Sequence, residues 1–390
     1  MKKSIILLLI LISVGSYAQT SFQITCNPFL QNMQSNAVTV FWEVNKTAKS
    51  WIEMGTNSVL GTKVTHSEDG LIDVGNGIQK VKLENLKAGE KYFYRVCSKE
   101  ITTLQGYKVI YGDSVFSQMY SFTMPPKPVE AFSFLVFNDL HNNASFVGNV
   151  TNSHPEFSFA VFNGDIPTDI NDETNFCKYI FSPLSTAFAT QKPIVMVRGN
   201  HETRGAASRN LYKYFDTPTG KYYYSYTWGN TFFLILDCGE DKQDANREYF
   251  GLADYDKYRS TEAVWLQEVV KSKEFKQAKF KVVCIHMPIA QKSIGAVADD
   301  HGTNDCGKKF LPILNKAGVD LILSGHTHTY RIIQKEKGFS TCPIVIGGAP
   351  YSAKSPDKAT YTKVEVSSKS LVARLMNLSG KEIDKVEKKK

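Results

Sequence analysis

The chain lacks the cysteine spacing of a zinc site or of a dense disulfide framework. Its 390 residues include seven scattered cysteines, and no two of them are separated by only two residues. Paired, closely spaced cysteines are what such sites require. The odd count leaves at least one thiol free in a monomer. Cys238 and Cys284 lie in apolar runs, where we expect them to be buried thiols.

Long apolar runs, internal repeats and low-complexity tracts are also missing after the first twenty residues. A membrane helix needs about 20 apolar residues, so we expect no membrane span. No basic helix or basic-aromatic pattern indicates nucleic-acid binding. The net charge of +8 fits an anionic substrate or surface, and fits solubility equally well. The oligomeric state stays open.

The first residues, MKKSIILLLILISVGSYAQT, have the pattern of a secretory signal peptide. Two lysines precede the apolar run 5–14, and small residues follow at Ser16 and Ala18. We expect residues 1–18 to be a signal peptide that is removed after Ala18. The mature protein would then be exported to the periplasm or secreted.

Residues 22–124 read as an all-β region. In AVTVFWEV, Val38, Val40, Trp42 and Val44 alternate with the residues of the opposite face, which is the period of a strand. Short strands with turn signals over about a hundred residues predict a β-sandwich. The stretch LENLKAGEKYFYRV resembles a strand pair of fibronectin type III domains. Three prolines in residues 125–130 predict a linker.

Residues 131–384 change pattern and predict an α/β layer sandwich. Near-continuous apolar runs such as FSFLVF, FAVF and VDLILS are typical of strands that are buried on both faces. Helical segments lie between some of them, and one should end at Gly318. Gly229-Asn230 separates two strand-like runs and predicts a hairpin. The fold class is therefore an all-β sandwich followed by an α/β domain of the α/β-β/α type.

Polar residues follow these apolar runs in a regular way. The runs end in Asp139 and His141, in Gly164-Asp165, in Gly199-Asn200-His201, in His286, and in Gly325-His326-Thr327-His328. Ligand sites of α/β sheets lie at the carboxyl ends of the strands, so these side chains should converge. Imidazole and carboxylate together suit zinc, iron and manganese. One carboxylate can also bridge two cations about 3.5–4 Å apart. The pattern predicts a shared metal site.

The motifs D-x-H, GD, GNH, H and GHxH in this order resemble the calcineurin-like metallophosphoesterase superfamily. The resemblance runs from Phe132 through the GHTH motif, and the region before it resembles the N-terminal domain of purple acid phosphatases. It implies two metal ions, whose identity among manganese, zinc and iron stays open. It also implies hydrolysis of a small phosphorylated substrate, a phosphate monoester, by attack of a metal-bound hydroxide.

Carried over position by position, the resemblance implies two ligand sets and a bridge. One set is Asp139, His141 and His328, the other is Asn200, His286 and His326, and Asp165 bridges the two ions. His201 would face the phosphate, where it stabilises the transition state or protonates the leaving oxygen. Arg204 would contact the substrate phosphate or pair with Asp169. His301 would lie in a substrate loop or in a plain surface loop.

This chain departs from purple acid phosphatases at two positions. Those enzymes bind ferric iron through a tyrosine three residues after the GD aspartate, and here that position is Thr168. They also lack the histidine that is present here as His141. We therefore expect no tyrosinate colour, and neither ferric iron nor an acidic pH optimum carries over.

Two other functions stay open from the sequence. The same site could hydrolyse diesters, nucleotides or nucleotide sugars. Alternatively, the chain could be a surface binding protein with a vestigial metal site, although none of the expected ligands is missing.

Overall fold

A computed structural model describes residues 20–289, 300–349 and 359–390. The predicted signal peptide lies outside these ranges. Within them, no helix has the length and apolar character needed to cross a bilayer. The seven cysteines, including Cys238 and Cys284, are buried free thiols.

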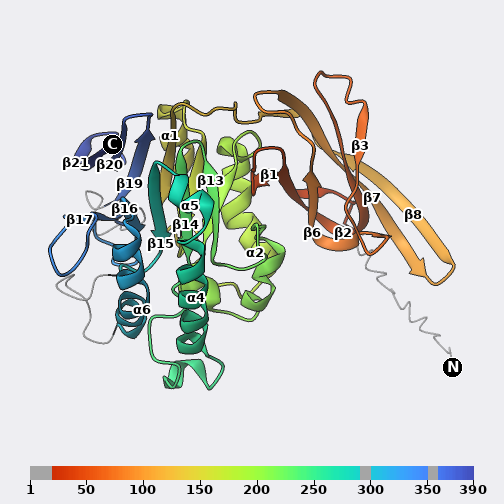
Figure 1. The fold of residues 1–390 in the computed structure, drawn as a ribbon. Helices are drawn as coiled ribbons and strands as arrows, with labels where there is room; N and C mark the ends of the chain where they lie inside the picture. The colour runs from red at the N-terminus through yellow and green to blue at the C-terminus, as the bar shows by residue number, and fades with distance from the viewer. Residues whose placement is uncertain (1–19, 290–299, 350–358) are drawn as a thin grey trace, which may run out of the picture.

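The N-terminal region is built from strands. They are β1 (Ile24–Gln31), β2 (Val38–Gly55), β3 (Thr62–Val64), β4 (Ser67–Glu68), β5 (Leu71–Ile72), β6 (Val74–Leu83), β7 (Lys91–Gln105), β8 (Lys108–Phe116) and β9 (Tyr120–Thr123). The long β2 pairs with β1 and β6 over its first part, and with β3 and β7 over its second. Val40 and Trp42 of β2 therefore share one core with Tyr94 and Val96 of β7. This confirms the predicted β-rich front region (Figure 1).

Two sheets form the centre of the second region. The first contains parallel β10 (Phe132–Phe137), β11 (Phe159–Asn163) and β12 (Ile194–Val197), extended by antiparallel β19 (Thr360–Val366), β20 (Ser370–Asn377) and β21 (Glu382–Lys389). The second runs β13 (Tyr224–Trp228), β14 (Thr231–Leu236), β15 (Phe280–Ile285), β16 (Leu321–Ser324), β18 (Ile344–Ile346) and β17 (Arg331–Ile333). Gly229-Asn230 joins β13 to β14 in the predicted hairpin. β21 continues past residue 384, the end that we expected for this region.

Helices cover the outer face of each sheet, so the region has four layers. The first sheet carries α1 (Val147–Ser153), α2 (Glu173–Phe176), η1 (Cys177–Phe181), α3 (Ser182–Leu184) and η2 (Ser185–Ala189), and the second carries α4 (Tyr255–Val269), α5 (Lys273–Gln277) and α6 (His301–Ala317). Short turns η3 (His201–Thr203), η4 (Ser208–Lys213) and η5 (Arg247–Tyr249) follow strand ends. Gly318 ends α6 at φ 69°, as predicted. The α/β-β/α fold class is confirmed.

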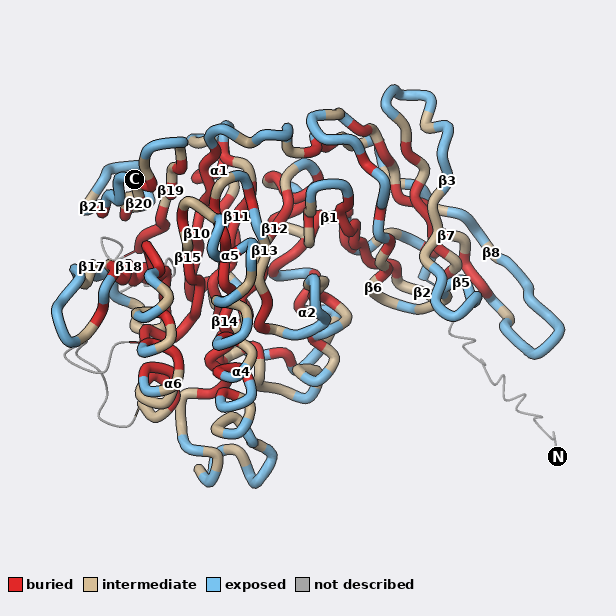
Figure 2. The backbone as a smooth tube through the Cα atoms, viewed as in Figure 1, coloured by how far each residue is buried: buried red, intermediate tan, exposed pale blue. Residues whose placement is uncertain are grey.

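The two sheets pack on each other through aromatic rings. Phe134 and Phe159 stack with centroids 4.9 Å apart, and Phe233 of the opposite sheet meets them edge-on at 5.4 and 5.7 Å. Figure 2 shows the central strands of both sheets, such as β10, β11, β14 and β15, as buried, while β8 stays exposed. Such pairs add to the apolar burial and fix the spacing of the two sheets. The sheets thus hold the loops at their ends in fixed positions.

The front region is docked on the first sheet. β1 pairs in parallel with β12 at Gln31 and Ile194, and Phe29 stacks on Phe181 at 4.1 Å. The Tyr94 hydroxyl donates to the carbonyl of Thr190 at 2.8 Å. Residues 124–131 join β9 to β10 without regular structure. The front region is therefore a fixed support for the helices next to β12.

Candidate metal centre

The predicted site residues lie in loops that follow five strands. Asp139 and His141 follow β10, Asp165 follows β11, Asn200 and His201 follow β12, His286 follows β15, and His326 and His328 follow β16. These strands are parallel within each sheet. Their carboxyl ends meet at one edge of the layered domain, which is why residues up to 189 positions apart become neighbours.

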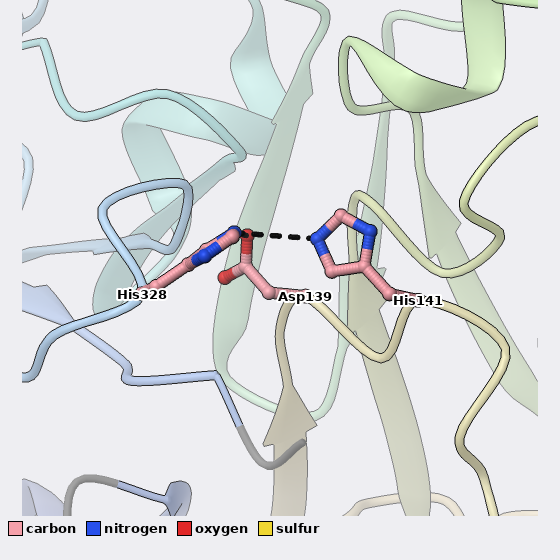
Figure 3. Close-up of side chains that lie close together, drawn as sticks. All are labelled: Asp139, His141 and His328. Atoms are coloured by element: carbon pink, nitrogen blue, oxygen red, sulfur yellow. Dashed lines mark hydrogen bonds and ion pairs between the residues drawn. The ribbon is translucent and has the colours of Figure 1, made fainter. Parts of the chain in front are cut away.

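Asp139, His141 and His328 form one potential ligand group (Figure 3). One ligand atom from each lies within 4.8 Å of the others. The Nε2 atoms of His141 and His328 are 3.2 Å apart, and His328 Nε2 is 3.5 Å from Asp139 Oδ1. Two imidazoles and one carboxylate facing one point match the donor chemistry of zinc, iron or manganese.

Asp165, His286 and His326 form a second group. His286 Nε2 lies 3.0 Å from Asp165 Oδ2. Asp165 also belongs to a third group, with His141 and His201. Its carboxylate therefore lies between the two sets of histidines, which is the placement that a bridging carboxylate needs.

Buried polar atoms at this edge include Asn200 Oδ1 and His326 Nδ1, which lack a hydrogen-bond partner among the described residues. His286 Nε2 is buried beside them and has only the Asp165 carboxylate, at 3.0 Å, as a neighbour of opposite charge. Buried polar atoms are rarely left without a partner, because each costs about 1–3 kcal/mol. These atoms belong to the three residues that were predicted to hold the second ion. An amide oxygen and imidazole nitrogens are common ligands of metal cations, so these atoms fit a metal site.

The second ring nitrogen of His286 fixes its orientation. Nδ1 lies 2.8 Å from the carbonyl of Asn163, to which it donates when it carries the ring proton. Nε2 then faces the site with its lone pair. A backbone carbonyl in this position is a common support for metal-binding histidines.

The backbone at the site is strained in the way that functional loops often are. Asp139, His141, Asp165, His326 and His328 all have positive φ, between 45° and 70°. Residues other than glycine rarely adopt this region, and each costs energy that the surrounding fold must offset. The strain aims five of the predicted ligands at one point.

Gly164 is required by the close approach of a ligand. A Cβ on Gly164 would lie 2.4 Å from the ring of His286, and its φ is 85°. Any other residue would push the imidazole out of position. This explains why a glycine stands directly before Asp165.

Two buried carboxylates face a buried imidazole at the site. Asp139 and Asp165 are at most 1% exposed. Burial raises the pKa of Asp139 to about 7. Burial alone would lower the pKa of His286, but the charges of Asp165 and Asp139 outweigh it and raise that pKa to about 10. A cation between these side chains would offset the cost of burying the ionised carboxylates.

His201 is held by the loop after β11 and by Arg204. Its Nδ1 lies 2.6 Å from the carbonyl of Thr168, and its Nε2 lies 3.0 Å from Arg204 Nη1. Because arginine only donates, Nε2 accepts and Nδ1 carries the proton. Nε2 also lies 3.8 Å from Asp165 Oδ2. The imidazole therefore stands at the edge of the metal-ligand cluster.

Arg204 does not pair with Asp169, one of the two partners that we predicted. Glu240, which is 2% exposed, accepts from Arg204 Nε at 3.0 Å and from Nη2 at 2.9 Å. Thr203 Oγ1 donates to the same carboxylate at 2.7 Å. Two of the guanidinium nitrogens are thus used to fix its plane, and the third faces His201.

We predicted that His301 lies in a loop, and this prediction is wrong. It is the first residue of α6, and its Nε2 lies 2.7 Å from Asp256 Oδ1 of α4. Asp256, His301 and Asp305 form a separate cluster, but Arg259 and Lys309 already contact its carboxylates. The imidazole links two helices.

Two acidic residues at the site were not predicted. Glu202 is fully buried and accepts the backbone N–H groups of Asp165, Ile166 and Gly199 at 2.8–3.0 Å. Its position directly after the GNH motif was the available signal in the sequence. Asp300 Oδ2 lies 3.3 Å from His326 Nε2. Only its capping pattern with Thr303 was visible in the sequence.

Comparison with known proteins agrees with the geometry. The family model described as Calcineurin-like phosphoesterase matches residues 132–330, just over half of the chain. A mouse (Mus musculus) protein named serine/threonine-protein phosphatase CPPED1 is 28% identical over 137 residues, which are 35% of this chain and 41% of that protein. This match therefore spans less than half of the mouse protein.

Purple acid phosphatase 17 of Arabidopsis thaliana is 26% identical over 239 residues, 56% of this chain and 69% of that protein. Among solved structures, purple acid phosphatase PPD1 from yellow lupin (Lupinus luteus) seeds superimposes with a TM-score of 0.70 at 15% identity, covering 92% of this chain and 73% of that one. A structure of PhoD gives a TM-score of 0.64 at 13% identity, covering 94% and 90%. Both likenesses extend over the front β region as well as the layered domain.

Proposed function

Because the chain belongs to the calcineurin-like phosphoesterase family, we propose that it is an exported, dinuclear-metal enzyme that hydrolyses phosphate monoesters. The observation that carries the proposal is the group of buried ligand atoms around the Asp165 carboxylate: Asn200 Oδ1 and His326 Nδ1, which lack a hydrogen-bond partner, and His286 Nε2, which lies 3.0 Å from Asp165 Oδ2. Relatives named as phosphatases support the reaction class. The signal-peptide pattern supports export.

The proposed roles follow from the two ligand groups. Asp139, His141 and His328 would hold one ion, Asn200, His286 and His326 would hold the other, and Asp165 would bridge them. Bound ions of this kind lower the pKa of a water and neutralise charge on the phosphate. The ions are manganese, zinc or iron in this proposal.

His201 Nε2 is the atom that we propose to face the phosphate. It lies at the edge of the cluster, within 3.8 Å of the Asp165 carboxylate. When the ring carries a second proton, on Nε2, this nitrogen can donate a hydrogen bond to the phosphate or a proton to the leaving oxygen. The Thr168 carbonyl holds Nδ1 on the other side of the ring, so Nε2 keeps its direction when Arg204 Nη1 bonds to a substrate in its place.

Arg204 supports monoesters over diesters. A monoester carries one more negative charge than a diester, and an additional cation must face it. Arg204 always carries its charge, and Glu240 holds the guanidinium so that Nη1 faces the cluster. His301 is not part of the proposal, because Asp256 binds its imidazole.

Hydrolysis of a chromogenic phosphate monoester and of its matching diester tests the proposal. The mature protein is prepared free of metal and reconstituted with manganese, zinc or iron, with Asp165→Asn as the control. The proposal predicts a monoester rate above the diester rate that falls at least about a hundredfold in the variant. A diester preference would redirect it to nucleotides or nucleotide sugars. Equal rates in both proteins would refute it.

A further inference from the structure

We propose that Asp300 is a positioning residue for His326, and that it strengthens the binding of one metal ion without contacting that ion. The inference rests on the proposed dinuclear site. His326 has two ring nitrogens with different surroundings. Nδ1 is the buried atom that lacks a partner, and Nε2 lies 3.3 Å from Asp300 Oδ2.

The geometry assigns each nitrogen its task. With the ring proton on Nε2, this nitrogen donates to the Asp300 carboxylate, and Nδ1 presents its lone pair to the site. A carboxylate behind a metal-binding imidazole fixes its tautomer and ring plane and makes it a better donor. The backbone N–H of His326 is bonded to the Asp139 carboxylate, which fixes the main chain but not the rotation of the ring. Asp300 supplies the missing restraint from another element.

Asp300 is itself held in place by the start of α6. It is the N-cap residue of this helix, and its Oδ1 accepts the backbone N–H of Thr303 at 2.9 Å. The Thr303 hydroxyl donates to Oδ2. The neighbouring His301 ties the same helix turn to Asp256 of α4. The carboxylate that faces His326 is therefore fixed to the helix layer of the second sheet.

Helix capping alone would also explain why an aspartate stands here, and two variants separate the explanations. Asp300→Asn keeps a good N-cap, because asparagine caps helices as well as aspartate does, but it removes the charge behind His326. Thr303→Val removes a hydroxyl donor to the same carboxylate and leaves the contact with His326 in place. A positioning role predicts an effect on metal binding from the first variant only.

The experiment titrates metal-free mature protein with zinc against a chromogenic chelator, and measures the melting temperature without metal. For Asp300→Asn we expect one of two zinc equivalents to bind about 10–100-fold more weakly, with the other unchanged. The melting temperature should stay that of the wild type. Thr303→Val should leave both affinities within about threefold.

A double variant identifies the path of the effect. His326→Ala should weaken the same equivalent, and adding Asp300→Asn to it should cause no further loss, because Asp300 acts through His326. The inference is overturned if Asp300→Asn leaves both affinities unchanged, or if its effect adds fully to that of His326→Ala. Zinc binding is measured without substrate, so a protein that binds two ions but hydrolyses no monoester would refute the proposed function and leave this result standing.

Discussion

Arg204 is the residue whose removal should distinguish monoesters from diesters most clearly. Its Nε and Nη2 bind Glu240, and its Nη1 faces His201 Nε2 at 3.0 Å. A phosphate oxygen beside His201 would accept from Nη1 in place of the imidazole. The guanidinium would then hold the second negative charge of a monoester with little reorganisation.

The magnitude follows from one charge-assisted hydrogen bond. Such a bond contributes about 1.5–3 kcal/mol. Since each 1.4 kcal/mol is a factor of ten, the loss in kcat/KM for a monoester should be about 10–150-fold. A diester lacks the charge that Arg204 is proposed to bind, so its kcat/KM should fall by no more than about threefold, on the same conversion applied to less than 0.7 kcal/mol.

The substitution must not leave Glu240 as an unpaired buried carboxylate. Breaking one side of a buried ion pair costs about 3–5 kcal/mol, which could disturb the loop after β14. Arg204→Gln with Glu240→Gln removes both charges together and keeps two polar side chains. Glu240→Gln alone is the matched control, since Arg204 keeps its charge there.

Steady-state kinetics with the two matched esters are the assay for the double variant. We expect kcat/KM to fall much more for the monoester than for the diester, with the metal content unchanged. Equal losses for both esters would show that Arg204 does not bind the second charge. A variant as active as the wild type on the monoester would show that the guanidinium does not reach the phosphate.

Three further predictions concern stability. Glu202→Ala leaves three buried N–H groups without their acceptor. Chemical denaturation should show that the free energy of unfolding falls by about 3–5 kcal/mol, because water replaces only part of the lost bonding. A fall below about 1 kcal/mol would show that the Glu202 carboxylate does not hold these groups. Burial and then the charge of Asp237 raise the pKa of Glu262 well above 4.5, so the folded protein keeps a proton that the unfolded chain releases, and stability falls as the pH rises above that value. Glu262→Gln should therefore unfold at higher denaturant than the wild type at pH 8 but not at pH 4; the opposite order would refute the burial argument. Phe29→Ala removes the ring that stacks on Phe181 and should cost about 3–5 kcal/mol in the same assay, whereas an independent front region would lose nothing in the transition of the layered domain.

The sequence predicted the strands and the order of the ligands because both depend on local pattern. Apolar runs specify buried strands, and in parallel sheets the carboxyl ends of those strands must meet, so Asp139, Asp165 and His286 could be placed at one edge. The family resemblance then divided the histidines into two sets. Neither the shared edge nor the two sets of histidines depends on knowing the distances between loops.

The partners of Arg204 and the place of His301 could not be predicted in this way. Glu240 is 36 positions from Arg204 and joins it only because β12 and β14 belong to sheets that pack face to face. His301 looked like a loop residue because polar residues surround it, yet Asp300 and Thr303 start a helix there. Contacts of this kind depend on how the layers are stacked, which periodicity does not report.

The position of the front β region also depended on tertiary structure. The alternation in β2 predicted its inner face correctly, but Phe41 on the opposite face is buried too. It lies against Phe29, which in turn stacks on Phe181. The sequence pattern of a strand does not show whether an apolar residue packs in the strand's own core or against another layer.

Metal stoichiometry measured together with activity decides whether this site is a dinuclear catalytic centre. Metal-free mature protein is titrated with manganese or zinc while hydrolysis of a phosphate monoester is followed. We expect the rate to reach its plateau at two ions per chain, and Asp165→Asn neither to bind both ions tightly nor to reach that rate. Full activity in excess chelator, or a plateau at one ion per chain, would contradict it.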